Sequence, residues 1–300
     1  MTESSASFRL VGAHPASTVP ATSAASGRKR FRRTTVLAGF VLAVMVLGCL
    51  FPEQMAGNDP SILHLAFVDH APDAEFWFGT DSLGRDIYSI IWEGGRTSLT
   101  VGLLSTAVIA VLGMTYGCVS GMASGGTDGI MMRFVELCQS VPRLLSQILL
   151  LSLLGTPDVL ELALVIGVTG WFALARMVRG EVRQIRDSDY ILAARCMGAS
   201  FCRIMRRHLV PNVISAVLFV IVSSVSTGMV MEATLSFMGL GLPVDVVSLG
   251  SMLALADKAL LLNTWWVIVF PGLFLMVILL CLTTLGQAFR RIHERGPSNL

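Results

Sequence analysis

The sequence predicts an all-α polytopic membrane protein with about six transmembrane helices, and three observations support this fold class. Hydrophobic residues make up 54% of the 300 residues and charged residues only 14%, with a mean hydropathy of +0.71. A soluble domain carries about 25% charged residues. The apolar residues gather in runs of about 20, the length of a transmembrane helix. Basic clusters alternate with acidic stretches between these runs, as expected for the two sides of a membrane.

Six apolar runs separated by polar or basic breaks are expected to be transmembrane helices, because each is long enough to cross the bilayer core. They cover residues 34–51, 97–121, 130–155, 159–179, 212–237 and 264–289.

The first run follows a basic cluster at 28–33, which is also the layout of a cleaved signal peptide. Pro52, Glu53 and Gln54 come next, without a small-x-small cleavage site, so we expect an uncleaved helix. The Ser-, Ala- and Thr-rich composition before that run predicts that residues 1–33 are disordered.

The basic residues predict the orientation of the chain. They cluster at 28–33, in the loop 176–207 and in the tail 290–295, and positive clusters favour the cytoplasmic side. Both termini are therefore expected in the cytoplasm, with the more acidic loops outside. The predicted units are a cytoplasmic segment 1–33, a first helix and external loop 34–96, a five-helix core 97–289, and a cytoplasmic tail 290–300.

Gly113, Gly117 and Gly121 recur every four residues on one face of the second predicted span. Small residues allow helices in lipid to approach closely. We therefore expect this face to pack against another helix.

The cytoplasmic segment 183–212 is long for a simple connector and is expected to have its own structure. A helix capped near Ser188 can run to Met197, and Gly198 can end it in a left-handed turn. Ser200 can cap a second helix that ends before Pro211. Such a hairpin suits a protein cleft, and the alternative is a basic hairpin lying on anionic lipid.

Ala193, Ala194, Gly198 and Pro211 stand in a pattern that resembles the EAA loop of ABC importer permeases, which docks into the ATPase subunit. Leu192 stands where that pattern has a glutamate. The resemblance implies a coupling loop over residues 180–212. The implied coupling residues are Tyr190, Ala193, Ala194, Arg195, Gly198, Ala199, Ser200, Arg203, Arg206, Arg207 and Pro211.

Further segments resemble the peptide/nickel branch of these permeases, in particular the C-type dipeptide and oligopeptide subunits. These segments read FGTD from Phe78, GRD from Gly84, GRTSL from Gly95, ARMVRGE from Ala175 and EATLSFMGLG from Glu232. The tail lacks the family's Asp-Gly-Leu-Arg-Asp run. The resemblance implies the type I ABC importer permease fold, in which the first helix is peripheral and the last five form the core.

The resemblance also implies the partners and the location. These are a homologous second permease in a heterodimer, two ABC ATPase subunits that use ATP and Mg, an external or periplasmic solute-binding protein, and the lipid of the cytoplasmic (inner) membrane. Short peptides are the leading substrate class, and nickel chelates and opine-type metallophores stay open.

The motifs of catalysis are missing from the sequence. It contains no GxxxxGK[ST], and its only lysines, Lys29 and Lys258, lie outside any such motif. It also contains no GxSxG, HExxH or spaced Cys/His set. We therefore expect no enzyme activity, no cofactor bound by this chain and no metal. A net charge of +2 gives no indication of nucleic acid.

Glu136, Arg143 and Glu232 lie in or near predicted spans, where ionisable groups are costly. They are candidates for lining a translocation pathway, and internal pairing is the alternative. His64 and His70 flank Asp69, but their spacing of six places them on no shared helix face, so we expect no metal site.

Two other function classes fit the composition. An ion-coupled secondary carrier or channel is the main alternative, although we detect neither inverted repeats nor interrupted helices in the sequence. A purely structural membrane anchor would need neither polar groups in its spans nor a structured loop. The loop 183–212 favours the importer.

Overall fold

The computed structural model describes residues 21–57, 64–243 and 245–293, and within them every regular element is a helix. The elements are α1 (Ala21–Leu50), α2 (Pro52–Met55), η1 (Leu65–Phe67), α3 (Ile87–Met122), α4 (Gly125–Ser140), α5 (Arg143–Leu154), α6 (Val159–Val168), α7 (Phe172–Ile185), α8 (Asp189–Cys196), α9 (Phe201–Ile204), η2 (Met205–Leu209), α10 (Val210–Phe237), α11 (Leu249–Leu253), α12 (Ala256–Leu262) and α13 (Trp266–His293). The all-α prediction is confirmed for this part of the chain.

Four helices of the described chain are long and apolar enough to cross a membrane, namely α1, α3, α10 and α13. The number rises to six if α4 with α5, and α6 with α7, each count as one span. The first pair is bent by 81° and the second by 49°. The predicted spans 130–155 and 159–179 are therefore each interrupted by a bend, and the prediction of continuous helices there is wrong.

The first break lies at Val141 and Pro142. Val141 has an extended backbone, with φ −85° and ψ 129°, because a residue before proline is disfavoured in the helical region. The second break follows Val168. There the Gly170 N–H bonds to the Gly167 carbonyl oxygen at 3.1 Å, three residues back, in place of the α-helical bond.

The first two long helices begin earlier than predicted. Helix α1 starts at Ala21, so the part of the predicted disordered segment at 21–33 is helical, and residues 1–20 lie outside the described residues. Helix α3 starts at Ile87, because the Asp86 carboxylate accepts the Tyr88 N–H at 3.2 Å and caps it.

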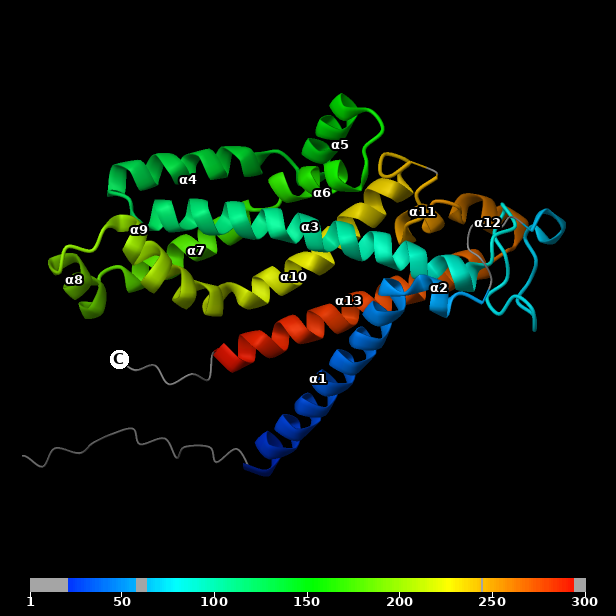
Figure 1. Ribbon diagram of the computed structural model, residues 1–300, viewed down its shortest axis with the longest axis horizontal. Coiled ribbons are helices and arrows are strands. Elements are labelled where there is room, and N and C mark those ends of the chain that lie inside the picture. The colour runs from blue at the N-terminus through cyan, green and yellow to red at the C-terminus, as the bar shows by residue number, and fades with distance from the viewer. Residues whose placement is uncertain (1–20, 58–63, 244, 294–300) are drawn as a thin grey trace, which may run out of the picture.

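Helix α3 lies at the centre of the molecule, where it packs on α6, α7 and α10 (Figure 1). Its glycine face meets α7 as predicted: a Cβ built at Gly117 would lie 2.5 Å from the Ala175 carbonyl oxygen. It crosses α10 just as closely, since a Cβ at Gly228 would lie 3.1 Å from the Gly102 Cα atom. Small residues at both contacts let the helix backbones approach.

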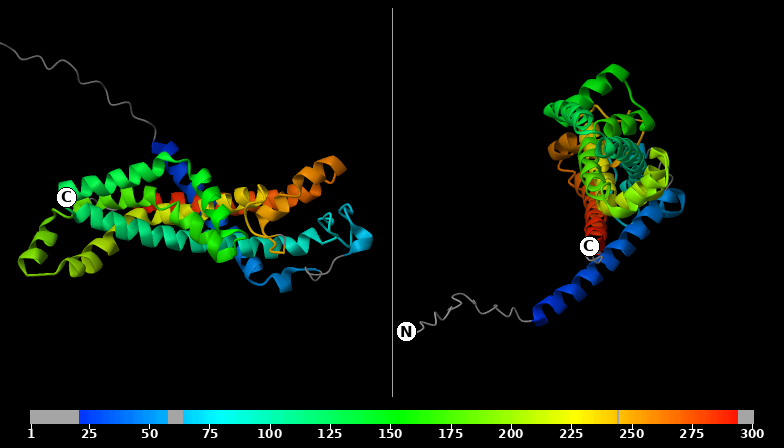
Figure 2. Two further views of the ribbon diagram at one scale, coloured as in Figure 1. Left: turned by 90° about the horizontal axis from the view of Figure 1, so that it is seen from above. Right: turned by 90° about the vertical axis from the view of Figure 1, so that its left-hand side faces the viewer.

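Helix α1 is peripheral, as the family resemblance implies. It packs mainly on α13, and its N-terminal half leans away from the other helices (Figure 2). The start of α1 and the end of α13 both point toward the end of the bundle that carries α8 and α9 (Figure 1).

The opposite end of the bundle carries a folded cap formed by residues 64–86. The Asp81 carboxylate accepts hydrogen bonds from two nitrogens of the Arg85 guanidinium, at 2.8 and 2.7 Å. Trp266 Nε1 donates to the Thr80 carbonyl oxygen at 3.2 Å, which holds the cap on the start of α13. The segments FGTD and GRD thus have a structural role in this cap.

Candidate coupling loop and translocation site

The hairpin of α8 and α9 projects from the end of the bundle (Figure 2) and turns at Gly198. Gly198 has φ +77°, and the Ala199 N–H bonds to the Ala194 carbonyl oxygen at 3.0 Å. This six-to-one bond closes a Schellman motif, whose left-handed position favours glycine. The predicted helix and left-handed turn are both present.

The two sides of α8 have different surroundings. Ile191 and Ala194 are buried in the chain's own core, together with Ile204 and Leu209. The opposite side is exposed, with Tyr190 at 46%, Leu192 at 45% and Met197 at 82% of full exposure. Ala193 is also exposed. Ala194 is therefore a core residue and is not on the predicted docking face.

The second helix of the hairpin differs from the prediction, because it does not end before Pro211. Helix α9 continues through the π-helical turn η2 into α10, and Pro211 lies in the first turn of α10. The Val210 N–H bonds to the Met205 carbonyl oxygen, five residues back. The wider turn lets the chain pass the proline, which has no N–H of its own.

The remaining predicted coupling residues surround the turn. Ser200, Arg203, Arg206 and Arg207 are exposed, and Ala199 is half-buried. Tyr190 Oη accepts a hydrogen bond from Asn212 Nδ2 at 3.4 Å, which joins α8 to α10. The side chain of Arg195 lies outside the described part of the structure.

A charged network that sequence reasoning missed supports the base of the hairpin. Asp128 on α4 is buried, and its two carboxylate oxygens accept bidentate bonds of 2.5 Å from Arg179 on α7. Ser120 Oγ on α3 donates to Asp128 at 2.6 Å, and Arg183 Nη1 lies 3.5 Å away. The sequence signal is the Arg179 and Arg183 pair, four residues apart on one helix face.

The three ionisable pathway candidates do not come together. Glu232 is fully buried and accepts hydrogen bonds from Ser98 Oγ at 2.7 Å and Ser236 Oγ at 2.9 Å. Ser98 Oγ also accepts the Leu249 N–H at 3.1 Å, so this network joins α3, α10 and α11. Glu232 is thus paired inside the chain.

Glu136 and Arg143 have other surroundings. Glu136 is exposed on α4 and forms an ion pair of 2.9 Å with Arg133. Arg143 lies at the bend between α4 and α5, where its Nη2 donates to the Ile166 carbonyl oxygen at 3.1 Å. Of the three candidates, Arg143 lines a cavity, of about 680 Å³, between the two broken spans.

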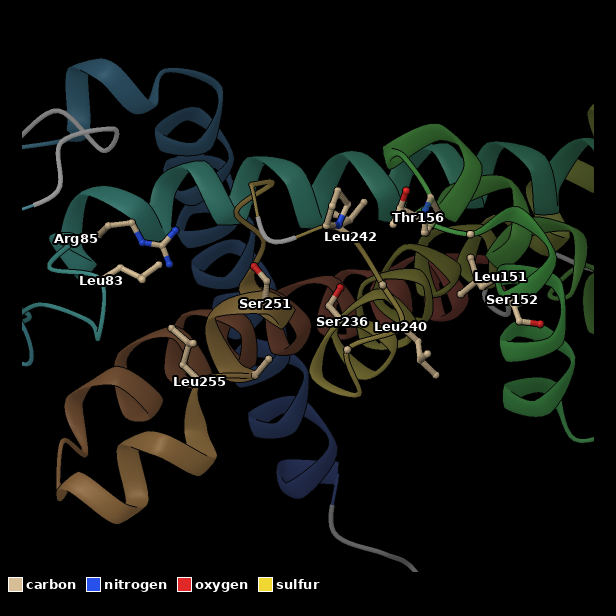
Figure 3. Close-up of a pocket in the computed structure, with 16 residues that line it drawn as sticks. Leu83, Arg85, Leu151, Ser152, Thr156, Ser236, Leu240, Leu242, Ser251 and Leu255 are labelled. Carbon is tan, nitrogen blue, oxygen red and sulfur yellow. The ribbon is translucent and has the colours of Figure 1, made fainter.

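A second cavity, of about 460 Å³, opens near the cap (Figure 3). The loops after α5 and α10, helix α11 and the cap contribute its lining, which combines leucines with the hydroxyls of Ser152, Thr156, Ser236 and Ser251. Arg85 also lines it, with its guanidinium paired to Asp81.

The histidines are packed in the cap. The His64 ring lies edge-on against Phe76, with 5.3 Å between ring centroids, and His70 Nδ1 lies 3.7 Å from Asp73. Within residues 21–57, 64–243 and 245–293, no group of three His, Cys, Asp or Glu side chains is placed to hold a metal ion.

Comparison with known sequences finds a matching protein family and similar proteins of related sequence. A family described as "binding-protein-dependent transport system inner membrane component" matches residues 113–298. The oligopeptide transport system permease protein OppC of Bacillus subtilis is 32% identical over 263 residues, which cover 88% of this chain and 86% of that protein. The dipeptide transport system permease protein DppC of the same organism is 37% identical over 219 residues, or 73% and 68% of the two chains.

Two solved structures share the fold. A chain of the MetNI methionine ABC transporter, in inward-facing conformations, superposes with a TM-score of 0.57 at 18% identity and covers 69% of this chain and 97% of its own length. A chain of an amino acid ABC transporter with histidines superposes with a TM-score of 0.51 at 17% identity, and covers 68% and 94%.

Proposed function

The chain belongs to the family of binding-protein-dependent transport system inner membrane components, and from this premise we propose that it carries short peptides and is driven by separate ATPase subunits. It is a transmembrane permease subunit with the fold of ABC transporter permeases. The peptide assignment is supported by two relatives, 32% and 37% identical, that are named for oligopeptide and dipeptide transport. Nickel chelates and opine-type metallophores are the secondary substrate candidates.

The observation that carries the coupling role is the projecting hairpin of α8 and α9. Its outer side exposes Tyr190, Leu192 and Met197, and apolar side chains in such a position favour a protein cleft over water. The exposed Arg203, Arg206 and Arg207 beside them add positive charge to the same end of the molecule. We place this end in the cytoplasm, following the rule that positive clusters stay inside.

The remaining partners follow from the same placement. The cap and its cavity then face outward, where a solute-binding protein would deliver the substrate. The exposed leucines of α4 and α5 leave an apolar surface for lipid or for the homologous second permease. They include Leu137 at 69% and Leu153 at 77% exposure. ATP and Mg are used by the ATPase subunits, and this chain needs to supply no cofactor site.

Gly198→Val tests the coupling role. A Cβ at Gly198 meets no atom within 4 Å, so this substitution acts through backbone conformation and not through a clash. Placing a residue that has a side chain in the left-handed backbone conformation costs roughly 1–2 kcal/mol of free energy, and the cost is highest for a β-branched residue such as valine. We expect unchanged permease abundance, weaker co-purification of the ATPase subunits and loss of uptake in proteoliposomes that contain the complete transporter.

The matched control is Gly198→Asn, because asparagine tolerates the left-handed region. It should keep most of the uptake. Full uptake and ATPase association by Gly198→Val would show that the hairpin is not the coupling element.

The two broken spans favour a second candidate, an ion-coupled carrier or channel, since interrupted helices form the binding sites of many such carriers. In those carriers the breaks lie at matching positions of two repeated halves. Here they lie in consecutive spans, which supports the importer. Peptide uptake by proteoliposomes that contain this chain without ATPase subunits would instead establish the carrier.

A further inference from the structure

The 680 Å³ cavity lies where the bend between α4 and α5 meets the bend between α6 and α7. Both bends interrupt predicted spans, and apolar side chains, among them Val141, Val168 and Phe172, form much of the cavity wall. Its polar lining consists of Gln139, Arg143, Ser146, Thr169 and Arg176. Irregular backbone within a span is tolerated where it lines a water-filled space or is buried in protein.

Arg143 is held in a defined position in this cavity. Its Nη2 donates to the Ile166 carbonyl oxygen, which is available because the Gly170 N–H bonds to Gly167 instead. A Cβ at Gly170 would lie 2.6 Å from Nη2, so glycine leaves the room that the guanidinium occupies. The Nε atom of Arg143 is buried and has no hydrogen-bond partner in the described structure.

The charges around the cavity are unbalanced. Two arginines line it, and no acidic residue is among its lining residues, all of which belong to the described part of the chain. Glu136, in the same broken span, is exposed and paired with Arg133. Arg143 is half-buried and Arg176 is exposed. A partly desolvated cation without a counter-ion is costly, so an anion that enters the cavity would be stabilised.

We propose that this cavity binds the C-terminal carboxylate of the peptide during its passage, with Arg143 as the principal contact and Arg176 as a second one. The inference rests on the proposed peptide transport. A planar guanidinium matches a carboxylate through paired hydrogen bonds. Every linear peptide carries this group whatever its side chains, so one fixed arginine serves substrates of many sequences.

The test compares a mixed pool of tripeptides that have free C-terminal carboxylates with the same pool as C-terminal amides. Uptake is measured by mass spectrometry in phosphatidylcholine proteoliposomes that contain the complete transporter. We expect Arg143→Gln to lower uptake of the free acids about tenfold, the scale of one charge-assisted hydrogen bond, and to leave the amides unchanged. The unmodified binding protein is present in every arm, so its own preference cancels in this comparison.

Three further variants distinguish loss of the carboxylate contact from a general folding defect. Arg176 is exposed, and Arg176→Gln should cause a smaller loss that is again confined to the free acids. Arg143→Lys keeps the charge without the fork and should lie between Arg143→Gln and the unmodified chain. Arg133→Gln, on the exposed side of α4, is the matched control and should change neither pool.

The outcomes separate this inference from the proposed function. Equal loss of acids and amides in Arg143→Gln, or no loss of either, would overturn the carboxylate site alone. An effect of Arg143→Gln that appears only when phosphatidylglycerol is added would assign the cavity to a lipid phosphate and would also overturn it. Failure of the unmodified transporter to take up either pool would overturn the peptide function itself.

Discussion

At the scale of single residues, the neighbours decide what an ionisable group does. In the sequence, Glu232 and Arg143 are equally good candidates for lining a translocation pathway, since both interrupt apolar runs. In the structure Glu232 accepts hydrogen bonds from serine hydroxyls, whereas Arg143 lines a cavity and its buried Nε atom has no hydrogen-bond partner in the described structure. The sequence cannot distinguish them, because their partners lie far away in the chain. Ser98, for example, precedes Glu232 by 134 residues.

Ser98→Ala tests the structural reading of Glu232. Ser98 Oγ donates to Glu232 and accepts from the Leu249 N–H, so its removal leaves the Leu249 N–H without this partner and reduces Glu232 to the hydrogen bond from Ser236 Oγ. We expect a loss of about 1–3 kcal/mol in the free energy of unfolding. The measurement is thermal unfolding of the purified permease in detergent.

The matched control is Ser152→Ala, because the exposed Ser152 hydroxyl only donates to the Leu149 carbonyl oxygen of its own helix. It should leave the unfolding temperature nearly unchanged. Equal effects of the two substitutions would mean that the network around Glu232 does not support the packing of α3, α10 and α11.

At the scale of elements, close packing of α3 against α7 depends on the absence of side chains. Gly117→Ala places a methyl group 2.5 Å from a backbone oxygen of α7, and that oxygen cannot move without the helix. We expect a cost of about 1–3 kcal/mol from the forced separation of the two helices. Thermal unfolding in detergent and the yield of folded protein both report it.

Gly129→Ala on α4 is the comparison, since a Cβ there meets no atom within 4 Å. Alanine stabilises a helix interior by about 1 kcal/mol relative to glycine, so this variant should be neutral or more stable. If Gly117→Ala behaved in the same way, α3 and α7 would not be in tight contact in the folded protein.

The elements also show where sequence reasoning succeeds. The left-handed turn at Gly198 and the packing of the α3 glycines were predictable, because each depends on local backbone chemistry or on one helix face. The breaks within the spans 130–155 and 159–179 were not predictable. Pro142 allows either a kink or a full interruption, and the second break, after Val168, has no proline. The burial of Ala194 was missed because a short helix does not reveal which side meets the core.

At the scale of the whole molecule, the proposed orientation can be tested by cysteine labelling in a chain without its native cysteines. Leu261 on α12 and Met197 at the tip of the hairpin are 87% and 82% exposed, at opposite ends. An impermeant maleimide should label Leu261→Cys in intact spheroplasts and Met197→Cys only after permeabilisation. The reverse pattern would invert the topology and remove the hairpin from the cytoplasm.

The composition and the basic clusters were enough to predict a polytopic helical protein and the approximate position of its spans, because a bilayer imposes length and polarity on any chain that crosses it. The cavities were not predictable. Each is lined by segments that lie far apart in the sequence, and its existence depends on how far two helices bend. The substrate group at Arg143 could therefore be proposed only from the structure.

Helix α3 has 36 residues, which at 1.5 Å per residue makes it about 54 Å long, well beyond the hydrocarbon core of about 30 Å. It contains no proline to act as a hinge. Its close crossing with α10 at Gly102 lies near its midpoint. It is also held against α7 at Gly117, nearer its C-terminal end, so α3 is anchored at more than one point along its length. One uninterrupted helix thus joins the cap to the base of the hairpin, and a displacement at either end is transmitted to the other.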